Sequence, residues 1–352
     1  MANLYLHVGH SKTGTTWIQA AAALSHQALH ANGIYYPTFG VERSPDSTEI
    51  ELGNASTAAL SLPRFAETLD AIGPLDGLRG ALLSSEELFV QLNALADPEA
   101  VAAAARAAGF DAIHVLLFIR NPMEHAASLW QQYLKRGGGS ARIEPFFEKY
   151  AVPARVAEFL ETYGAHEHIA VTVYNYSRHR AAVLAPVSRW LDVAPDIWTT
   201  ARVGTLNRSL TAGELAFQRT LNRYIGKAGA ILSDALCERL PDLPPSDLRP
   251  ARALQEETWQ RLQPAMARVD ARVAEPEHYR YDIRDGESDA LVLGAEQIEV
   301  IADAMGAEIR RLRLQVAEFG LAMTDPRGVG PIEDSALRAN KTETSTPWEF
   351  RP

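Results

Sequence analysis

A glycine-containing loop near the amino terminus has the residue types that hold anions. Residues 9–16 read GHSKTGTT and lie between a short apolar run at 4–8 and an Ala-rich segment that begins at Thr15. The backbone N–H groups of residues 11–16 and the start of the next helix predict a concave site for a diphosphate-like group. Gly9 and Gly14 have the spacing of a nucleotide P-loop, but the lysine, Lys12, lies inside the loop. We expect Lys12 to supply a mobile positive charge there.

A second motif follows an apolar run at residues 113–119. The run ends in Arg120-Asn121-Pro122, after which helical spacing begins. Asn121 suits an N-cap and Pro122 suits the first helical position. Arg120 is therefore expected at the carboxyl end of a strand, where open α/β sheets bind ligands. Ser128 follows eight residues later, and an arginine with a nearby hydroxyl can bracket one phosphate.

Together the two motifs resemble the cofactor site of sulfotransferases that use 3′-phosphoadenosine 5′-phosphosulfate (PAPS). The loop is similar to the family's 5′-phosphosulfate loop, a strand followed by K-[ST]-G-T-T and a helix, and Arg120 with Ser128 is similar to its 3′-phosphate motif. The resemblance covers about residues 4–225 and is sharp only in these motifs. It implies PAPS as donor, 3′-phosphoadenosine 5′-phosphate (PAP) as product and no required metal. Lys12 would stabilise the leaving phosphate.

The resemblance also assigns binding residues. Those expected at the cofactor are Ser11, Lys12, Thr13, Gly14, Thr15, Thr16, Arg120 and Ser128. In this family, loops in the region of residues 202–209 close over the 3′-phosphate, which makes Arg202, Asn207 and Ser209 further candidates. A polar loop without a ligand explains the same three residues equally well.

Glu86 is the first candidate for the base that takes the acceptor's proton. The apolar run 81–85 leads directly into Glu86 and Glu87, and in a P-loop-kinase-like sheet this third strand lies beside the first, close to Lys12. Relatives that this chain resembles carry a Ser-Ser-Glu at this strand end. Two adjacent acids also suit the first turn of a helix. His10 and His125 are the other candidates for the base.

The elements that must position these residues follow from the apolar pattern. Strands are expected at 4–8, 33–36, 80–85, 113–119 and 169–174, and helical spacing occurs at 15–30, 98–108, 123–136, 145–163 and 180–191. Strands apolar on both faces predict a parallel sheet. The expected fold is therefore α/β, a P-loop-kinase-like central parallel sheet of about five strands flanked by helices, with a mainly helical carboxyl-terminal part.

The expected domain organisation is one sulfotransferase domain at 1–322 with an irregular tail at 323–352. Residues 1–200 form the PAPS-binding core and 201–322 the mainly helical part that completes the site. There, Thr211 and Glu214 have the spacing of a capping box for a helix to about residue 224, and longer helices are expected near 246–273 and 295–319. The loop at 38–64 is a flap over the acceptor or a disordered insertion, and residues 135–142 are a mobile lid or a helix C-cap with a loop.

Composition limits the class of protein. The chain has 352 residues, a formal charge of −10 and one cysteine, Cys237. The charge argues against nucleic-acid binding, and a single cysteine permits no internal disulfide, so Cys237 is expected to be a small buried residue. We expect no signal peptide, no membrane span and a cytoplasmic location. The helix near 295–319 allows an oligomer.

Three functions therefore remain open on the sequence. The first is sulfuryl transfer from PAPS to a hydroxyl or amine of a carbohydrate or small metabolite, whose identity the sequence does not give. The second is a phosphotransferase that uses ATP and magnesium, which the displaced lysine disfavours. The third is a module that binds PAP or a related nucleotide without chemistry.

Overall fold

The computed structural model describes residues 2–39, 53–200, 208–286 and 292–323. Five strands form a single all-parallel sheet in the order β2-β3-β1-β4-β5. The strands are β1 (Ala2–His7), β2 (Ile34–Tyr35), β3 (Gly80–Ser84), β4 (Phe110–Ile119) and β5 (Ile169–Asn175). The predicted α/β fold is confirmed, and so is the position of β3 beside β1, with Leu6 opposite Leu83. The carboxyl ends of β3, β1 and β4 therefore lie next to one another.

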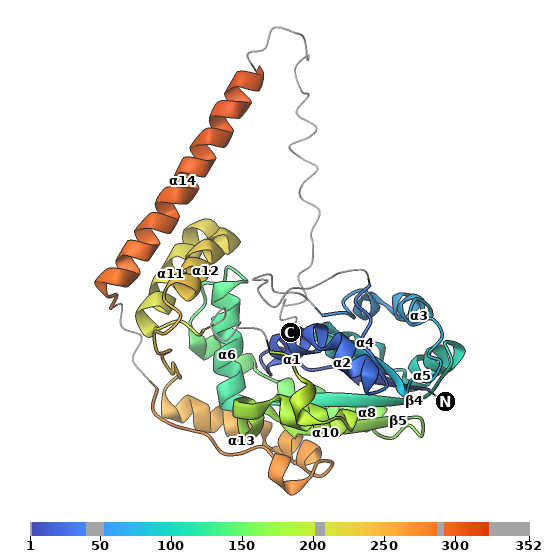
Figure 1. Cartoon of the computed structure of the whole chain (residues 1–352). Helices are drawn as coiled ribbons and strands as arrows, with labels where there is room; N and C mark the ends of the chain where they lie inside the picture. Colours follow the sequence, from blue (N-terminus) through green and yellow to red (C-terminus); the bar gives the residue numbers. More distant parts are fainter. Residues whose placement is uncertain (1, 40–52, 201–207, 287–291, 324–352) are drawn as a thin grey trace. The chain divides into compact units, whose positions relative to one another are not determined.

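Helices make up most of the remaining described chain, and those in the part that holds the sheet flank it (Figure 1). In chain order they are α1 (Thr15–Leu24), α2 (His26–Ala31), α3 (Leu62–Asp70), α4 (Glu87–Leu95), α5 (Pro98–Ala107), α6 (Pro122–Lys135), α7 (Ile143–Lys149), α8 (Val152–Tyr163), α9 (Tyr176–His179), α10 (Leu184–Leu191), α11 (Ala212–Ile225), α12 (Ala230–Arg239), α13 (Arg252–Asp270) and α14 (Ala295–Met323). None of these helices is both long and apolar enough to cross a membrane.

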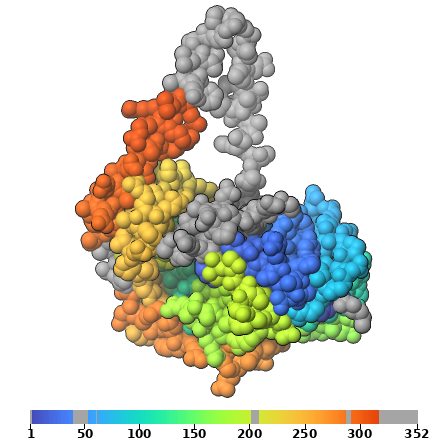
Figure 2. Space-filling view, viewed as in Figure 1, coloured from blue at the N-terminus to red at the C-terminus, as the bar shows by residue number. Residues whose placement is uncertain are grey.

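The inner strands β1 and β3 are largely buried on both faces, which fits their mainly apolar sequences. One face carries Tyr5, Leu82 and Leu116, which pack in one cluster with side chains of α1, α2 and α10. Leu4 and Leu6 point to the opposite face and are also fully buried. Figure 2 shows at the surface that the blue α1–α2 segment lies beside the yellow-green segment that contains α10. The loop after β1 is thus supported from both sides.

Two predicted helices are each divided in the structure. The segment 15–30 breaks at Ser25, which follows α1 and precedes α2, and whose hydroxyl accepts a hydrogen bond from the backbone N–H of Thr199 (2.7 Å). The segment 145–163 breaks at Tyr150, which has an extended backbone. Pro153 explains the second break, because a proline fits the first turn of a new helix but not the interior of a continuing one.

The described chain divides into two compact units. Residues 1–131, 141–209 and 245–289 form the first, which holds the sheet, and residues 132–140, 210–244 and 290–352 form the second. In the second unit, the predicted capping box is confirmed: the Thr211 hydroxyl accepts from Glu214 N (3.3 Å) and Glu214 Oε2 accepts from Thr211 N (2.8 Å). Cys237 is buried, as predicted.

Candidate functional site

Two left-handed residues shape the loop between β1 and α1. Lys12 has a φ of 66° and Gly14 a φ of 81°. A β-carbon at Gly14 would also lie 2.8 Å from the Tyr176 ring, so this position requires glycine on two counts. Gly14 is the N-cap of α1, and no described side chain caps the helix there. The helix N-terminus can therefore serve an external acceptor, as at anion-binding sites.

Side chains hold three successive carbonyl groups of this loop. The contacts are Thr13 Oγ1 to His10 O (2.6 Å), His125 Nε2 to Ser11 O (2.9 Å) and Arg120 Nη1 to Lys12 O (2.9 Å). In a planar trans peptide, the C=O and the following N–H point in opposite directions. The N–H groups that follow these carbonyls therefore point away from the side chains that hold them. Successive N–H groups turned to one side are typical of an anion-binding loop.

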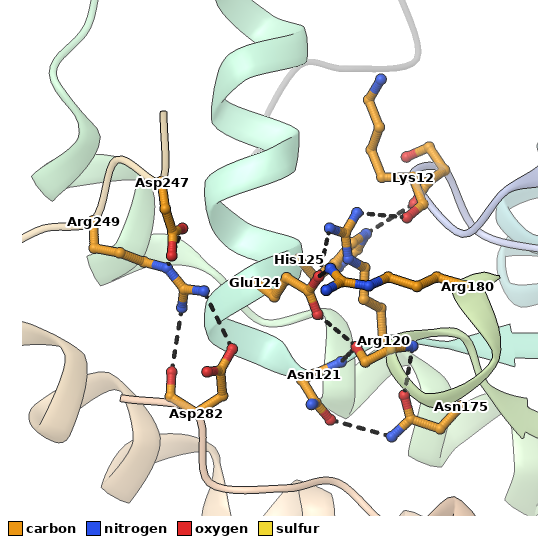
Figure 3. Close-up of polar contacts among 12 residues, drawn as sticks. Lys12, Arg120, Asn121, Glu124, His125, Asn175, Arg180, Asp247, Arg249 and Asp282 are labelled. Atoms are coloured by element: carbon orange, nitrogen blue, oxygen red, sulfur yellow. Dashed lines mark hydrogen bonds and ion pairs between the residues drawn. The ribbon is translucent and has the colours of Figure 1, made fainter. Parts of the chain in front are cut away.

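Arg120 joins the two sequence motifs. It follows the last residue of β4, and its Nη1 donates to the carbonyl of Lys12, 108 residues earlier in the chain. Its guanidinium also lies over the Tyr176 ring, 5.4 Å from the centroid. In Figure 3 the guanidinium lies beside the Lys12 backbone, whereas the Lys12 side chain points away from it. The predicted phosphate loop and the arginine at the strand end are therefore parts of one cluster.

Glu124 is the centre of a polar network that the sequence reasoning missed. It forms ion pairs with Arg120 (3.0 Å) and Arg180 (3.1 Å) and accepts a hydrogen bond from the Ser177 hydroxyl (2.7 Å), as Figure 3 shows for the two arginines. Burial raises the pKa of Glu124, but Arg120, Ser177 and Arg180 together outweigh burial and hold that pKa below its ordinary value. Glu124 is therefore an anion at neutral pH, already bound to the arginine expected to meet a phosphate.

Asn121 fixes the strand end that carries Arg120. The helix α6 starts on its carbonyl, which accepts from His125 N (2.9 Å). Its side-chain oxygen does not turn to the helix but accepts from Asn175 Nδ2 (3.1 Å) and from the backbone N–H of Arg280 (3.2 Å). The amide thereby ties the ends of β4 and β5 together, so that α9 and its Ser177 lie beside Arg120.

The other predicted 3′-phosphate residues are less closely assembled. Ser128 is half-buried on α6 and is not among the residues that contact Arg120 in the described part of the chain. Ser209 is half-buried, and its carbonyl accepts a hydrogen bond from Arg208 Nη1 (3.1 Å). Arg202 and Asn207 lie outside the described residues.

Glu86 lies at the end of β3, the strand next to β1, as the sequence predicts. It is the N-cap residue of α4 and is half-buried, and Glu87 opens the first turn of that helix. Burial raises the pKa of Glu86; the charge of Lys12 lowers it and the charge of Glu87 raises it. Burial prevails, so the pKa of Glu86 lies above its ordinary value. The carboxyl group and the Lys12 ammonium are near enough to influence each other.

A short segment that the sequence reasoning placed in the 38–64 loop closes over the same strand end. Asn54 is buried, donates to Leu82 O (3.0 Å) and accepts from Ser84 N (2.8 Å). Gln19 of α1 reaches Ser84 O at 3.4 Å. This part of the loop is therefore an ordered support for β3, whereas residues 40–52 lie outside the described chain.

The two histidines considered as alternative bases are buried and neutral. Burial lowers the pKa of His10 to about 4, with Ser11 opposing and Arg120 adding to the effect. Burial, His10 and Arg120 hold the pKa of His125 well below its ordinary range. Both ring nitrogens of His125 are engaged, Nδ1 with the Tyr150 hydroxyl (2.7 Å) and Nε2 with Ser11 O (2.9 Å). His125 therefore has no nitrogen left to take a proton from an acceptor.

The glycine run after α6 is anchored. In the second unit, Asn222 Nδ2 donates to Leu134 O (2.8 Å) and Gly139 O (2.7 Å), and the Lys135 ammonium is buried 3.4 Å from the Cys237 sulfur. Of the two predictions for residues 135–142, these contacts favour a helix C-terminus with a fixed loop over a mobile lid.

The residues present fit a doubly phosphorylated nucleotide in charge and donor type. Lys12, Arg120 and Arg180 supply three cations, and Glu86 and Glu124 two carboxyl groups. Thr16 is exposed at the start of α1 and Ser11 is half-buried. Thr15 Oγ1 and Arg120 Nε are buried without a partner among the described residues, which indicates positions where a water or ligand oxygen is missing. No group of three His, Cys, Asp or Glu within the described chain is placed to hold a metal.

Comparisons with known proteins add no further assignment. Neither the models of known protein families nor the curated proteins contain a match to this chain.

Proposed function

We propose that this chain is a PAPS-dependent sulfotransferase that transfers a sulfuryl group to a hydroxyl or amine of a small acceptor. The observation that carries the proposal is the 2.9 Å hydrogen bond from Arg120 Nη1 to the carbonyl of Lys12. It brings two motifs from distant parts of the chain to one place, where each would meet a different phosphate of the same nucleotide. A single anion-binding loop would not distinguish this nucleotide from other phosphates.

Lys12 and the start of α1 would hold the 5′-phosphosulfate end. Bound PAPS supplies an activated sulfuryl group whose leaving group is a phosphate oxygen that gains charge as the S–O bond breaks. The Lys12 ammonium, on a flexible stem beside the left-handed turn, is suited to stabilise that charge. Glu86 has a raised pKa and lies near Lys12, and it would accept the proton of the acceptor.

Arg120 would hold the 3′-phosphate after an exchange of partners. Its Nη2 is paired with Glu124, which also binds Arg180. A phosphate dianion would compete with this carboxylate for Arg120, and Arg180, whose side chain is 65% exposed, can retain Glu124 or join the phosphate. Ser128, two turns along α6, would supply a hydroxyl donor to the same group.

A PAP titration of the wild type, Lys12→Ala and Arg120→Ala tests this proposal. PAP should stabilise the wild type against thermal unfolding, and each variant should bind PAP roughly 10–100-fold more weakly, the effect of losing one charge-assisted hydrogen bond. Arg64→Ala is the matched control, because Arg64 pairs with Glu67 on the exposed surface of α3, away from the loop.

Three results would contradict the proposal. Equal stabilisation of all four proteins by PAP would remove the nucleotide site. Turnover of ATP with magnesium would favour a phosphotransferase. Tight PAP binding without sulfuryl transfer to any member of a panel of sugar and phenol acceptors, together with no effect of Glu86→Gln on function, would favour a binding module.

A further inference from the structure

His125 links the phosphate loop to a tyrosine on another element. It lies on the first turn of α6 and is 1% exposed. Its Nε2 is 2.9 Å from the carbonyl of Ser11, and its Nδ1 is 2.7 Å from the Tyr150 hydroxyl. The His10 ring lies 4.5 Å away, centroid to centroid. The contacts connect the loop, α6 and the end of α7 through one imidazole.

The partners of this imidazole determine its tautomer. A carbonyl oxygen only accepts, so Nε2 must carry the proton that it donates to Ser11 O. A neutral imidazole has one N–H, so Nδ1 must accept, and the Tyr150 hydroxyl must donate to it. Burial raises the pKa of Tyr150 well above its ordinary value, so the hydroxyl keeps that proton. The Ser11 carbonyl thereby fixes the Nε2–H form, and the Tyr150 hydroxyl holds the ring in place by donating to Nδ1.

Tyr150 is itself held in place. Its backbone N–H donates to Phe147 O (3.2 Å), and its carbonyl accepts from Arg261 Nη1 of α13 (2.9 Å). Arg261 Nη2 also donates to Phe147 O (2.9 Å). The hydroxyl that faces His125 therefore comes from a fixed turn between α7 and α8, not from a mobile loop.

We propose that His125, held in place by the Tyr150 hydroxyl, is a positioning residue that sets the orientation of the Ser11–Lys12 peptide in the phosphate loop. With the Ser11 carbonyl held toward α6, the N–H of Lys12 is turned to the opposite side, where an anionic oxygen would be bound. The identity of this anionic oxygen as part of the nucleotide rests on the proposed function. The ordering of the loop by His125 does not.

Arg120 and His125 hold neighbouring carbonyls of the loop. Arg120 holds the next carbonyl, that of Lys12, and both side chains come from the same strand–helix junction. His10 Nδ1 also lies 3.3 Å from Ser11 O, a longer contact than the 2.9 Å from His125 Nε2. The charged and titratable groups near it are His10, Lys12, Arg120 and Tyr150, and each of the three basic groups disfavours a second proton on the ring.

Three substitutions separate the contacts. His125→Phe keeps a planar ring but cannot donate to Ser11 O. His125→Gln can place an amide N–H near the position of Nε2 and so restore that donation. Tyr150→Phe leaves the imidazole but removes the hydroxyl that donates to its Nδ1 and holds the ring. Tyr163→Phe is the matched control, because it removes another buried tyrosine hydroxyl, the donor to Leu92 O (2.8 Å) in α4.

The first measurement is amide hydrogen exchange of peptides that cover residues 9–19 in the ligand-free protein. In His125→Phe and Tyr150→Phe we expect exchange there to be at least roughly tenfold faster, the effect of one lost buried hydrogen bond. His125→Gln should restore protection to near wild type, and Tyr163→Phe should leave these peptides unchanged. The second measurement is the PAP dissociation constant, which should follow the same order.

Unchanged exchange of these peptides in both His125→Phe and Tyr150→Phe would overturn the proposal, as would equal loosening in Tyr163→Phe. If His125→Phe does not fold, Tyr150→Phe and His125→Gln decide the question. The two proposals fail separately. If the wild type does not bind PAP but the loop exchanges faster in these variants, the positioning role stands and the nucleotide assignment fails. If His125→Phe binds PAP as tightly as the wild type does, the nucleotide assignment stands and the positioning role fails.

Discussion

Two carboxyl groups beside the loop are tuned in opposite directions. Burial raises the pKa of Glu86, whereas Arg120, Ser177 and Arg180 overcome burial at Glu124 and lower its pKa. Groups whose environments separate their pKa values are often those with distinct chemical roles. Glu86 is thus better suited than an ordinary carboxyl group to exchange a proton, and Glu124 is suited to remain a fixed anion.

The substitution Glu86→Gln should remove transfer activity and keep nucleotide binding. Loss of a general base costs about 10²–10⁴-fold in rate, and the amide removes a negative charge near Lys12, so PAP binding should stay the same or tighten. In the wild type, the rate should fall as pH drops through the raised pKa of Glu86, because only the carboxylate accepts a proton. Steady-state rates across pH and PAP titrations check both expectations.

Glu87→Gln is the control for this prediction. Glu87 opens the first turn of α4, one residue further from the strand end. Its neutralisation should lower the pKa of Glu86, because the two charges repel each other, and so shift the acid limb of the rate profile to lower pH without abolishing transfer. A Glu86→Gln enzyme with wild-type rates would exclude Glu86 as the base.

The substitution Glu124→Gln should change stability and affinity in opposite directions. The Arg120–Glu124 pair is largely buried, with side chains 15% and 11% exposed, and breaking such a pair costs about 3–5 kcal/mol. The same change frees Arg120 from a competing carboxylate, so PAP should bind several-fold more tightly. Thermal melts without and with PAP measure the two effects, and weaker PAP binding would show that Glu124 orients Arg120 instead of competing for it.

The sequence predicted the positions of Lys12 and Arg120 in the fold better than it predicted the partners of these residues. Lys12 and Arg120 are recognisable because their neighbours fix the strand, loop and helix around them. Glu124 was open to prediction as well, since it follows Arg120 by four residues, in the first turn of the helix after that strand end. Tyr176, Ser177 and Arg180 were not, because their contacts depend on β5 lying beside β4, which no local pattern states.

At the scale of elements, the helices and strands themselves were easier to predict from the sequence than the breaks within helical segments. The capping box at Thr211 and the strand before Arg120 carry local signals, and both occur where expected. The break of α1 from α2 at Ser25 has no such signal, and the contact of Ser25 with Thr199, 174 residues away, could not be predicted from a local pattern either. Asn54 illustrates the same limit. Asparagine is a common residue in polar loops, so only the fold shows that this one contacts β3.

The start of α11 gives a prediction at this scale. Thr211→Ala should lower the free energy of unfolding of the second unit by about 1–2 kcal/mol, since it removes an N-cap and a partner of Gln297 Nε2 (3.2 Å). Thr211→Ser should restore most of this loss, because the serine hydroxyl can make the same contacts. Urea denaturation followed by exchange of α11 amides tests it, and equal stability of the alanine and serine variants would contradict it.

At the scale of the whole chain, the site is a local exception to the overall charge. The formal charge is −10, yet Lys12, Arg120 and Arg180 gather at one end of the sheet. All the described site residues belong to the first compact unit. The expected contribution of residues 201–207 remains a prediction, because those residues lie outside the described structure.

Three buried histidines around this site predict how the chain responds to acid. Burial lowers the pKa of His7 to about 3 and that of His10 to about 4, and it holds the pKa of His125 well below its ordinary value. In the unfolded chain these groups titrate near 6.5, so below that pH the unfolded state binds more protons. The stability they contribute is therefore full above pH 6.5 and declines as pH falls toward 4.

The expected decline in stability is large enough to measure at pH values above those at which ordinary carboxylates titrate. Each histidine should cost about 1.4 kcal/mol by pH 5.5, whereas the raised pKa of Glu86 acts in the opposite direction over part of this range. His7→Asn should make the slope of stability against pH shallower by about a third, because its amide can still bond Ser84 Oγ, which lies 2.8 Å from His7 Nδ1, without binding a proton. Urea titrations between pH 7.5 and 5.0 compare the wild type with His7→Asn. If the wild type were equally stable across that range, these imidazole rings would be hydrated and not enclosed. The phosphate loop would then lack the fixed contacts on which the proposed site depends.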